Sequence, residues 1–293
     1  MNEDKKKLQA EHEAKYMKYM SDFEACGGDF TKCGGNCSSC SSNCEGSQND
    51  DKTPKKAQRI VAIFSGKGGT GKSVTTCLLA DKLQKMGKKV AVLDADLENP
   101  SIHYLYGKVE SCGSDGEKLL PMKADSGVEF ISWGNVEKDA TQPLLSYGKD
   151  IAEGALHFYM NVKWSEDLDF MLIDMPSGIG DVPLQIGTII PFDGSVLVSN
   201  PSDLCDFLAN KSVNLMKLIM IPVVGVIENK AYLQLEDGAV MLGTDPAEHA
   251  GALKLPLLAT VPLNLELSVM ADFGRISDAE VPELDPVVEV LVK

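Results

Sequence analysis

Two things are scarce in this sequence: long apolar runs and basic side chains. None of its hydrophobic stretches approaches the roughly 20 residues that span a membrane as a helix, and residues 1–25 carry too much charge for a signal peptide. The 28 Lys and Arg residues are outnumbered by 43 Asp and Glu residues, which gives a net charge of −15. So acidic a chain is poorly suited to DNA, because sequence-independent binding to DNA depends on neutralising phosphates, and equally to anionic membrane surfaces. We therefore expect a cytoplasmic protein that binds neither nucleic acid nor membrane.

Cysteine is sparse over most of the chain and concentrated in one stretch. Five of the eight cysteines fall within residues 26–44. The other three, Cys77, Cys112 and Cys205, stand alone, and we expect them to be small buried apolar side chains rather than ligands.

Residues 26–44 are built from thiols separated by small residues. Such a segment has too few hydrophobic side chains to fold by itself, and a bound metal or cluster would supply the missing ordering energy. The Cys-x-x-Cys spacing of Cys37 and Cys40 suits iron–sulfur or Zn²⁺ ligation, and a redox-active or unliganded tail is the alternative. Five thiols exceed the four that one site needs, so the candidate ligands are Cys26, Cys33, Cys37, Cys40 and Cys44.

A glycine-rich loop at residues 65–73, Ser-Gly-Lys-Gly-Gly-Thr-Gly-Lys-Ser, stands between an apolar run and a helical pattern. This order of strand, loop and helix is the context of a phosphate-binding P-loop. Glycines let backbone N–H groups turn toward phosphate oxygens, and the helix N-terminus adds its positive dipole end. Lys72 would reach the β- and γ-phosphates of ATP, and the Ser73 hydroxyl would hold Mg²⁺. The predicted nucleotide-binding residues are Gly66, Lys67, Gly68, Gly69, Thr70, Gly71, Lys72 and Ser73.

Acidic residues follow two further predicted strands. The strand at residues 89–93 leads into Asp94 and Asp96, and the apolar run from residue 169 ends at Asp174, the Walker B form. Open α/β sheets bind ligands at the carboxyl ends of their strands. We expect Asp94 and Asp174 to hold Mg²⁺ through water, and Asp96 to orient the attacking water. Asn229, after a later strand, either reads the adenine edge or is a turn residue.

Apolar runs alternate with helical patterns from residue 58 to residue 293, and 44% of the whole chain is hydrophobic, which is ample for a core. This alternation predicts an α/β fold, a mostly parallel sheet with helices on both faces. The chain then divides into a charged helix at 1–25, the Cys-rich segment at 26–44, a linker at 45–57 and an ATPase domain at 58–293. The remaining predicted strands are 128–133, 195–200, 223–228 and 257–261, and the remaining predicted helices are 151–164 and 203–220.

Taken together, these motifs resemble the Mrp branch of the P-loop ATPases with a deviant Walker A loop, a class that includes MinD, ParA and the nitrogenase iron protein. Lys67, directly before two glycines, is the mark of that loop. The resemblance implies that two protomers close on ATP as a homodimer, with Lys67 crossing to the partner's nucleotide. The catalytic residues would then be Lys67, Lys72 and Asp96. The other matching motifs are residues 94–96, 100–102, 173–181, 225–229, 261–263 and 271–275.

The resemblance also implies a role in assembling or carrying iron–sulfur clusters, with apo client or assembly proteins as partners and a [4Fe–4S] cluster or Zn²⁺ as the bound group. The family usually carries a Cys-x-x-Cys shortly after its Glu-Asn, where two protomers hold a bridging cluster. This chain has no cysteine at residues 232–238, and Asn99 and Ser177 replace the usual glycine and proline. We therefore expect the cluster to be held by the N-terminal cysteines.

Three functions compete. The first is a slow, Mg²⁺-dependent ATPase that acts as an iron–sulfur scaffold or carrier, and the second is an ATP-switched dimeric adaptor whose cysteines form a Zn²⁺ or structural site. The third is a positioning ATPase like ParA or MinD. The acidic net charge disfavours the third, as does the acidic segment at 278–293, which is no basic amphipathic membrane helix. A nitrogenase-like iron protein would need paired cysteines inside the domain, and Cys112 and Cys205 are no convincing pair.

Overall fold

The computed structural model describes residues 53–137 and 148–293. The predicted N-terminal helix, the Cys-rich segment and residues 45–52 of the predicted linker lie outside the described residues. Residues 53–57 lie against the body of the domain, where the Thr53 N–H donates to the Ile189 carbonyl and the Pro54 carbonyl accepts from the Tyr159 hydroxyl.

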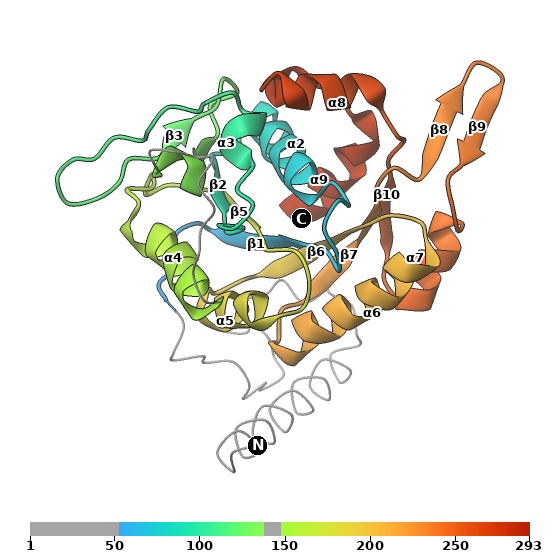
Figure 1. The fold of residues 1–293 in the computed structure, drawn as a ribbon, viewed down its shortest axis with the longest axis horizontal. Helices are drawn as coiled ribbons and strands as arrows, with labels where there is room; N and C mark the ends of the chain where they lie inside the picture. The colour runs from blue at the N-terminus through green and yellow to red at the C-terminus, as the bar shows by residue number, and fades with distance from the viewer. Residues whose placement is uncertain (1–52, 138–147) are drawn as a thin grey trace, which may run out of the picture.

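The described residues form an eight-stranded sheet in the order β10-β7-β6-β1-β5-β2-β4-β3. Every pair is parallel except the pair of β3 and β4 at one edge. The predicted α/β fold, a mostly parallel sheet with helices on both faces, is confirmed (Figure 1). The strands are β1 Arg59–Phe64, β2 Val90–Asp94, β3 Met122–Lys123, β4 Glu129–Ile131, β5 Phe170–Asp174, β6 Gly194–Ser199, β7 Val223–Glu228 and β10 Leu257–Thr260.

Helices cover both faces of the sheet, so its central strands are apolar at almost every position rather than alternating. Helices α2, α3, α8 and α9 lie on one face and α4 to α7 on the other (Figure 1). The helices are α2 Lys72–Lys85, α3 Ile102–Leu105, α4 Gly148–Asn161, α5 Asp181–Ile189, α6 Asp203–Leu218, α7 Pro246–Leu253, α8 Leu265–Asp272 and α9 Asp285–Val292, with short 3₁₀ turns η2 Trp133–Asn135, η3 Ile276–Asp278 and η4 Pro282–Leu284.

The register of the central strands positions the site. Ile63 of β1 pairs with Asp174 of β5, and Asp174 pairs in turn with Asp94 of β2. All three strands run parallel, so their carboxyl ends lie together on the same side of the sheet. The loop from β1 into α2 begins on that side. The predicted acids therefore arrive beside the P-loop.

Among the predicted strands the one at 128–133 differs most from the structure, and several short elements, a hairpin among them, were not predicted. The expected strand at 128–133 ends at Ile131, because Ser132 turns its hydroxyl toward Asp94 and a 3₁₀ turn follows. Residues 232–241 form a hairpin of β8 Tyr232–Leu235 and β9 Gly238–Met241 that stands away from the body (Figure 1). No helix in the described part of the chain is both long and apolar enough to cross a bilayer.

Candidate nucleotide-binding site

The loop between β1 and α2 needs glycine at specific positions. Gly69 and Gly71 have φ of 81° and 90°, in the left-handed region that other residues rarely adopt. A Cβ on Gly71 would lie 2.2 Å from Asn229 Nδ2, and a Cβ on Gly66 would lie 2.6 Å from the carbonyl carbon of Leu208 in α6. The loop is therefore held between the end of β7 and the backbone of α6, with no room for side chains at either contact.

Lys72, the first residue of α2, forms a buried ion pair with Asp174 at the end of β5. Its Nζ lies 2.9 Å from Asp174 Oδ1, and the Thr76 hydroxyl donates to the same oxygen at 3.1 Å. Burial alone lowers the pKa of Lys72, but the charge and hydrogen bond of Asp174 outweigh it and raise that pKa. Lys72 is therefore charged and held at the point where the P-loop would receive phosphates.

The second oxygen of Asp174, Oδ2, is buried and has no hydrogen-bond partner within the described structure. A buried acceptor of this kind costs free energy unless water or an ion satisfies it. A hydrated Mg²⁺ bound next to Ser73 would supply the missing donor, so these residues fit the predicted cofactor.

Asp94 is fully buried at the end of β2. Its Oδ2 accepts from the Ser132 hydroxyl at 2.7 Å and from the backbone N–H groups of Ser101 and Ile102 at 3.0 and 3.2 Å. Burial, together with the neighbouring charge of Asp174, raises the pKa of Asp94 to about 7. Asp94 therefore organises the loop after β2, and its predicted water-mediated contact with Mg²⁺ would use the other oxygen.

Asp96 lies closer to solvent than Asp94 and is partly buried. Burial raises its pKa, and its Oδ1 accepts from the Asn99 N–H at 3.3 Å. Asp94, Asp96 and Asp174 all contribute to the electrostatic environment of Lys72. Three carboxyl groups around one ammonium leave an excess of negative charge that a divalent cation would relieve.

Asn229 and Lys230 attach the end of β7 to the P-loop, a contact that the sequence did not reveal. Asn229 Nδ2 donates to the Thr70 carbonyl at 2.7 Å, and Lys230 Nζ donates to the Gly69 carbonyl at 3.1 Å. From the sequence, Asn229 is either a residue that reads the adenine edge or a turn residue. In this structure its side-chain amide stabilises the loop itself.

The Lys67 side chain, unlike that of Lys72, pairs with no carboxylate among the described residues. The Ser65 hydroxyl donates to the Lys67 carbonyl at 2.9 Å, whereas the Lys67 ammonium makes no ion pair with any described residue. The loop after β5 lies alongside, since the Gly178 N–H donates to the Ser65 carbonyl at 3.1 Å. A loop in contact with the P-loop is well placed to respond to the γ-phosphate.

A family profile described as NUBPL iron-transfer P-loop NTPase, of the ParA group, matches residues 56–291. The chain belongs to this family. The iron-sulfur cluster carrier protein of Clostridium perfringens is 33% identical over 229 residues, which is 74% of this chain and 80% of that protein. The iron-sulfur cluster carrier protein of Pseudomonas fragi is 36% identical over 231 residues, 74% of this chain and 77% of that protein.

Solved structures agree with this placement. A nucleotide-binding protein from Archaeoglobus fulgidus in complex with ADP is 33% identical, with a TM-score of 0.66 over 77% of this chain and 90% of that one. The cell division ATPase MinD from Pyrococcus furiosus has a TM-score of 0.60 over 80% of this chain and 98% of that one, and at 22% identity it shows the fold alone. The resemblance to deviant P-loop ATPases inferred from the motifs is confirmed.

The five candidate ligand cysteines all lie outside the described residues. Within the described ranges no three or more His, Cys, Asp or Glu side chains are grouped so that they could hold a metal ion, and the Mg²⁺ contacts expected of Asp94 and Asp174 run through water. Cys77 and Cys205 are buried and Cys112 is half-buried, and burial raises the pKa of Cys77 well above its usual value. The burial of Cys77 and Cys205 agrees with the expected small buried side chains, whereas Cys112 is only half-buried.

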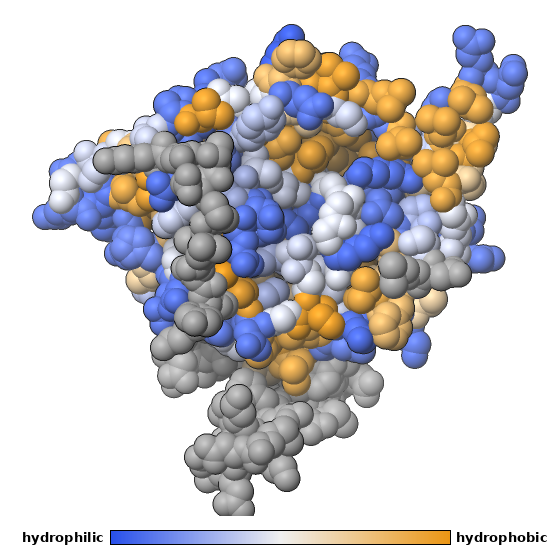
Figure 2. Space-filling model, in the orientation of Figure 1, coloured by the Kyte–Doolittle hydropathy of each residue, from blue (hydrophilic) through white to orange (hydrophobic). Residues whose placement is uncertain are grey.

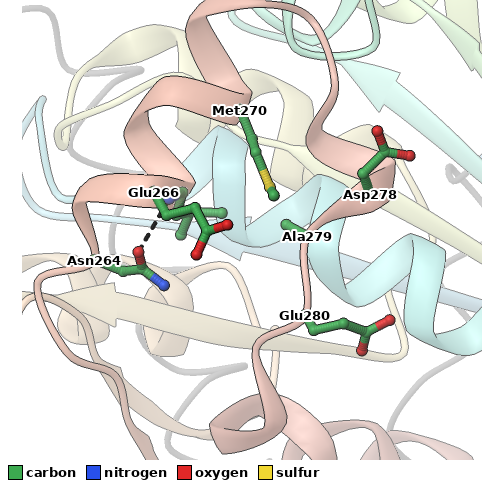
Figure 3. Close-up of a pocket in the computed structure, with 7 residues that line it drawn as sticks. Asn264, Glu266, Met270, Asp278, Ala279 and Glu280 are labelled. Carbon is green, nitrogen blue, oxygen red and sulfur yellow. Dashed lines mark hydrogen bonds between the residues drawn. The ribbon is translucent and has the colours of Figure 1, made fainter.

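A surface hollow between α8 and η3 of the NTPase domain is separate from the P-loop (Figure 3). Carboxylates surround a small apolar floor there, but Asp278 pairs with Arg275, and Glu280 pairs with Lys85. No residue of the nucleotide site contributes to it, so we assign it no part in ATP binding. Its lining is Asn264, Glu266, Leu267, Met270, Asp278, Ala279 and Glu280.

Proposed function

We propose that this protein is an ATP-dependent iron–sulfur cluster scaffold or carrier that binds Mg²⁺-ATP, hydrolyses it slowly and delivers its cluster to apo client or assembly proteins. The observation that carries the nucleotide half is the buried ion pair of Lys72 and Asp174, with the unsatisfied second oxygen of Asp174 beside a P-loop. The cluster half is supported by relatives named iron-sulfur cluster carrier protein and by the five cysteines between residues 26 and 44.

The P-loop residues divide the work of binding and hydrolysis. Backbone N–H groups around Gly68 and Gly69 bind the phosphates, and Lys72 exchanges its contact with Asp174 for one with the β- and γ-phosphate oxygens. Ser73 and, through water, Asp174 and Asp94 would hold Mg²⁺, which when bound neutralises charge on the phosphates. Asp96, nearer to solvent than Asp94, would orient the attacking water.

A second copy of the chain would complete the site. The Lys67 ammonium has no internal ion-pair partner in the described structure, which suits a group that acts on the nucleotide of another protomer. Apolar side chains gather over the hairpin β8–β9 and over α8 (Figure 2). They supply surface that a homodimer would bury. The exposed residues are Leu235, Val240, Met241 and Leu242 in and directly after the hairpin, and Leu265, Val269 and Phe273 along and just after α8.

The proposed cluster ligands are four of Cys26, Cys33, Cys37, Cys40 and Cys44. Thiolates are soft ligands that suit a [4Fe–4S] cluster, and they suit Zn²⁺ as well. The hairpin after Asn229 contains no cysteine, so the N-terminal segment would hold the cluster without help from the NTPase domain. The same absence supports the second candidate, an ATP-switched adaptor with a Zn²⁺ or structural cysteine site.

Anaerobic purification of the full chain, with an optical spectrum and iron, sulfide and zinc analysis, decides between the two candidates. We expect a brown protein whose iron and sulfide are lost in the double variant Cys37→Ser, Cys40→Ser. Cys112→Ser, which changes a thiol far from the Cys-rich segment in sequence, should retain both and serves as the control. Stoichiometric iron and sulfide in the double variant would place the cluster elsewhere, and zinc alone in the unaltered protein would favour the adaptor.

A further inference from the structure

His249 of α7 is buried between two carboxylates from other elements. Its Nδ1 lies 2.5 Å from Glu228 Oε1 at the end of β7, and its Nε2 lies 3.0 Å from Asp206 Oδ1 in the first turns of α6. The side chains of His249 and Glu228 are 0% exposed, and that of Asp206 is 27% exposed. The contact with Asp206 is an ion-pair approach outside hydrogen-bond geometry. Burying these groups is costly unless they stabilise one another.

The charged groups that face the imidazole are Glu228 from β7 and Asp206 from α6, and both are acidic. Burial alone lowers the pKa of His249, but the hydrogen bond and charge of Glu228, with the charge of Asp206, outweigh it and raise that pKa. Only the protonated imidazole has a donor at each ring nitrogen. A neutral ring would leave one carboxylate facing a lone pair.

The two carboxylates of this Glu228–His249–Asp206 bridge lie close in sequence to the residues that contact the P-loop. Glu228 directly precedes Asn229, whose amide donates to the Thr70 carbonyl. Asp206 lies two residues before Leu208, whose backbone packs against Gly66 so closely that no Cβ would fit. The P-loop is therefore held between the end of β7 and the start of α6. His249 connects these two elements through its contacts with Glu228 and Asp206.

We propose that His249 is a positioning residue of the nucleotide site. It sets the spacing between β7 and α6 and thereby the conformation of the P-loop in the nucleotide-free protein. The proposal rests on the proposed ATP-binding function. It predicts that ATP affinity is greatest while the imidazole is protonated and falls as pH rises through its titration. His249 is buried against Glu228 and Asp206 and makes no contact with the P-loop itself that the described structure records, so we expect it to act on affinity and not on the chemical step.

The test compares the full chain with His249→Gln and with Asp206→Asn, measuring ATP affinity by calorimetry between about pH 6 and pH 9, across the range where histidine titrates. We expect His249→Gln to weaken ATP binding about tenfold at the acidic end, the scale of one charged hydrogen bond, and much less at the alkaline end. The ratio of the two dissociation constants at each pH cancels the titration of the nucleotide and of Asp94. His157→Gln, an exposed histidine on α4, is the matched control and should leave the ratio at one.

Asp206→Asn removes the partly exposed end of the bridge and keeps the proposal testable if His249→Gln folds poorly. It should weaken ATP binding in the same pH-dependent way, and the double variant should be no worse than His249→Gln alone. Variants that bind ATP as the unaltered chain does at every pH would overturn the positioning role of His249 while leaving the proposed function intact. A uniform loss across the pH range would equally overturn it. Failure of the unaltered chain itself to bind ATP would overturn both the proposed ATP-binding function and the positioning role of His249.

Discussion

Replacing Asp94 with asparagine should make the nucleotide-free protein more stable above neutral pH while impairing its nucleotide site. Asp94 Oδ2 accepts three hydrogen bonds, whereas Oδ1 accepts only a long contact of 3.3 Å from the Asp96 N–H. The carbonyl oxygen of asparagine can replace Oδ2, so the main contacts survive. What is removed is a buried negative charge beside Asp174.

The size of the effect follows from the pKa of Asp94, which burial and the charge of Asp174 raise to about 7. The unfolded chain titrates near its usual value of about 3.9, so between about pH 4 and pH 7 the folded state holds the proton more tightly. Stability therefore falls as pH rises through this window and is level above it. A difference of about 3 pH units at about 1.4 kcal/mol each gives an upper limit of about 4 kcal/mol. Losing the Asp96 contact subtracts about 1 kcal/mol.

The measurement is urea unfolding of the full chain without nucleotide or Mg²⁺, followed by circular dichroism across the same pH range. We expect Asp94→Asn to flatten the pH dependence and to exceed the unaltered chain in free energy of unfolding by up to about 3 kcal/mol at pH 8. Asp237→Asn, which makes the same charge change in the exposed hairpin turn, should leave the profile unchanged. An unchanged profile in Asp94→Asn, or lower stability at every pH, would refute this reasoning.

Two further predictions concern the lysines of the P-loop. Lys72→Ala should abolish ATP binding measured by calorimetry, and should lower the free energy of unfolding by about 3 kcal/mol because Asp174 stays buried without its partner; ATP turnover like that of the unaltered protein would disprove the P-loop assignment. Lys67→Ala should keep most of the ATP affinity yet lose turnover by about 10³-fold, since it removes charge needed mainly in the transition state. Turnover by a strictly monomeric species, seen by light scattering alongside the ATPase assay, would argue against a lysine that crosses between protomers.

The local pattern of the chain was enough to predict the P-loop and most of the sheet. Buried parallel strands are continuous apolar runs, so residues 60–64 and 169–173 could be identified without their neighbours. The positive φ angles of the P-loop are likewise a local requirement, and the loop motif already has glycine at those positions. The family resemblance rested on the same local motifs, and the profile that matches residues 56–291 confirmed it.

Short elements in the C-terminal part of the chain, such as β8, β9 and α7, were not predicted, although some carried local sequence signals. The hairpin β8–β9 turns at Asp237 before Gly238, a Gly-containing turn signal, and Asp245 before Pro246 caps α7 by accepting from two backbone N–H groups. The strand predicted at 128–133 was too long, because only the folded structure brings Ser132 against Asp94.

The sequence by itself determined which elements form and which polar residues stand at their ends, because hydrophobic periodicity, glycine and capping act over a few residues. Only the tertiary structure decided what those polar residues do, since Thr70 and Asn229 are 159 positions apart and yet lie 2.7 Å from one another, from carbonyl to amide. The same holds for the bridge through His249 and for the raised pKa of Asp94. Burial and the proximity of charges depend on the whole sheet, so no window of sequence contains them.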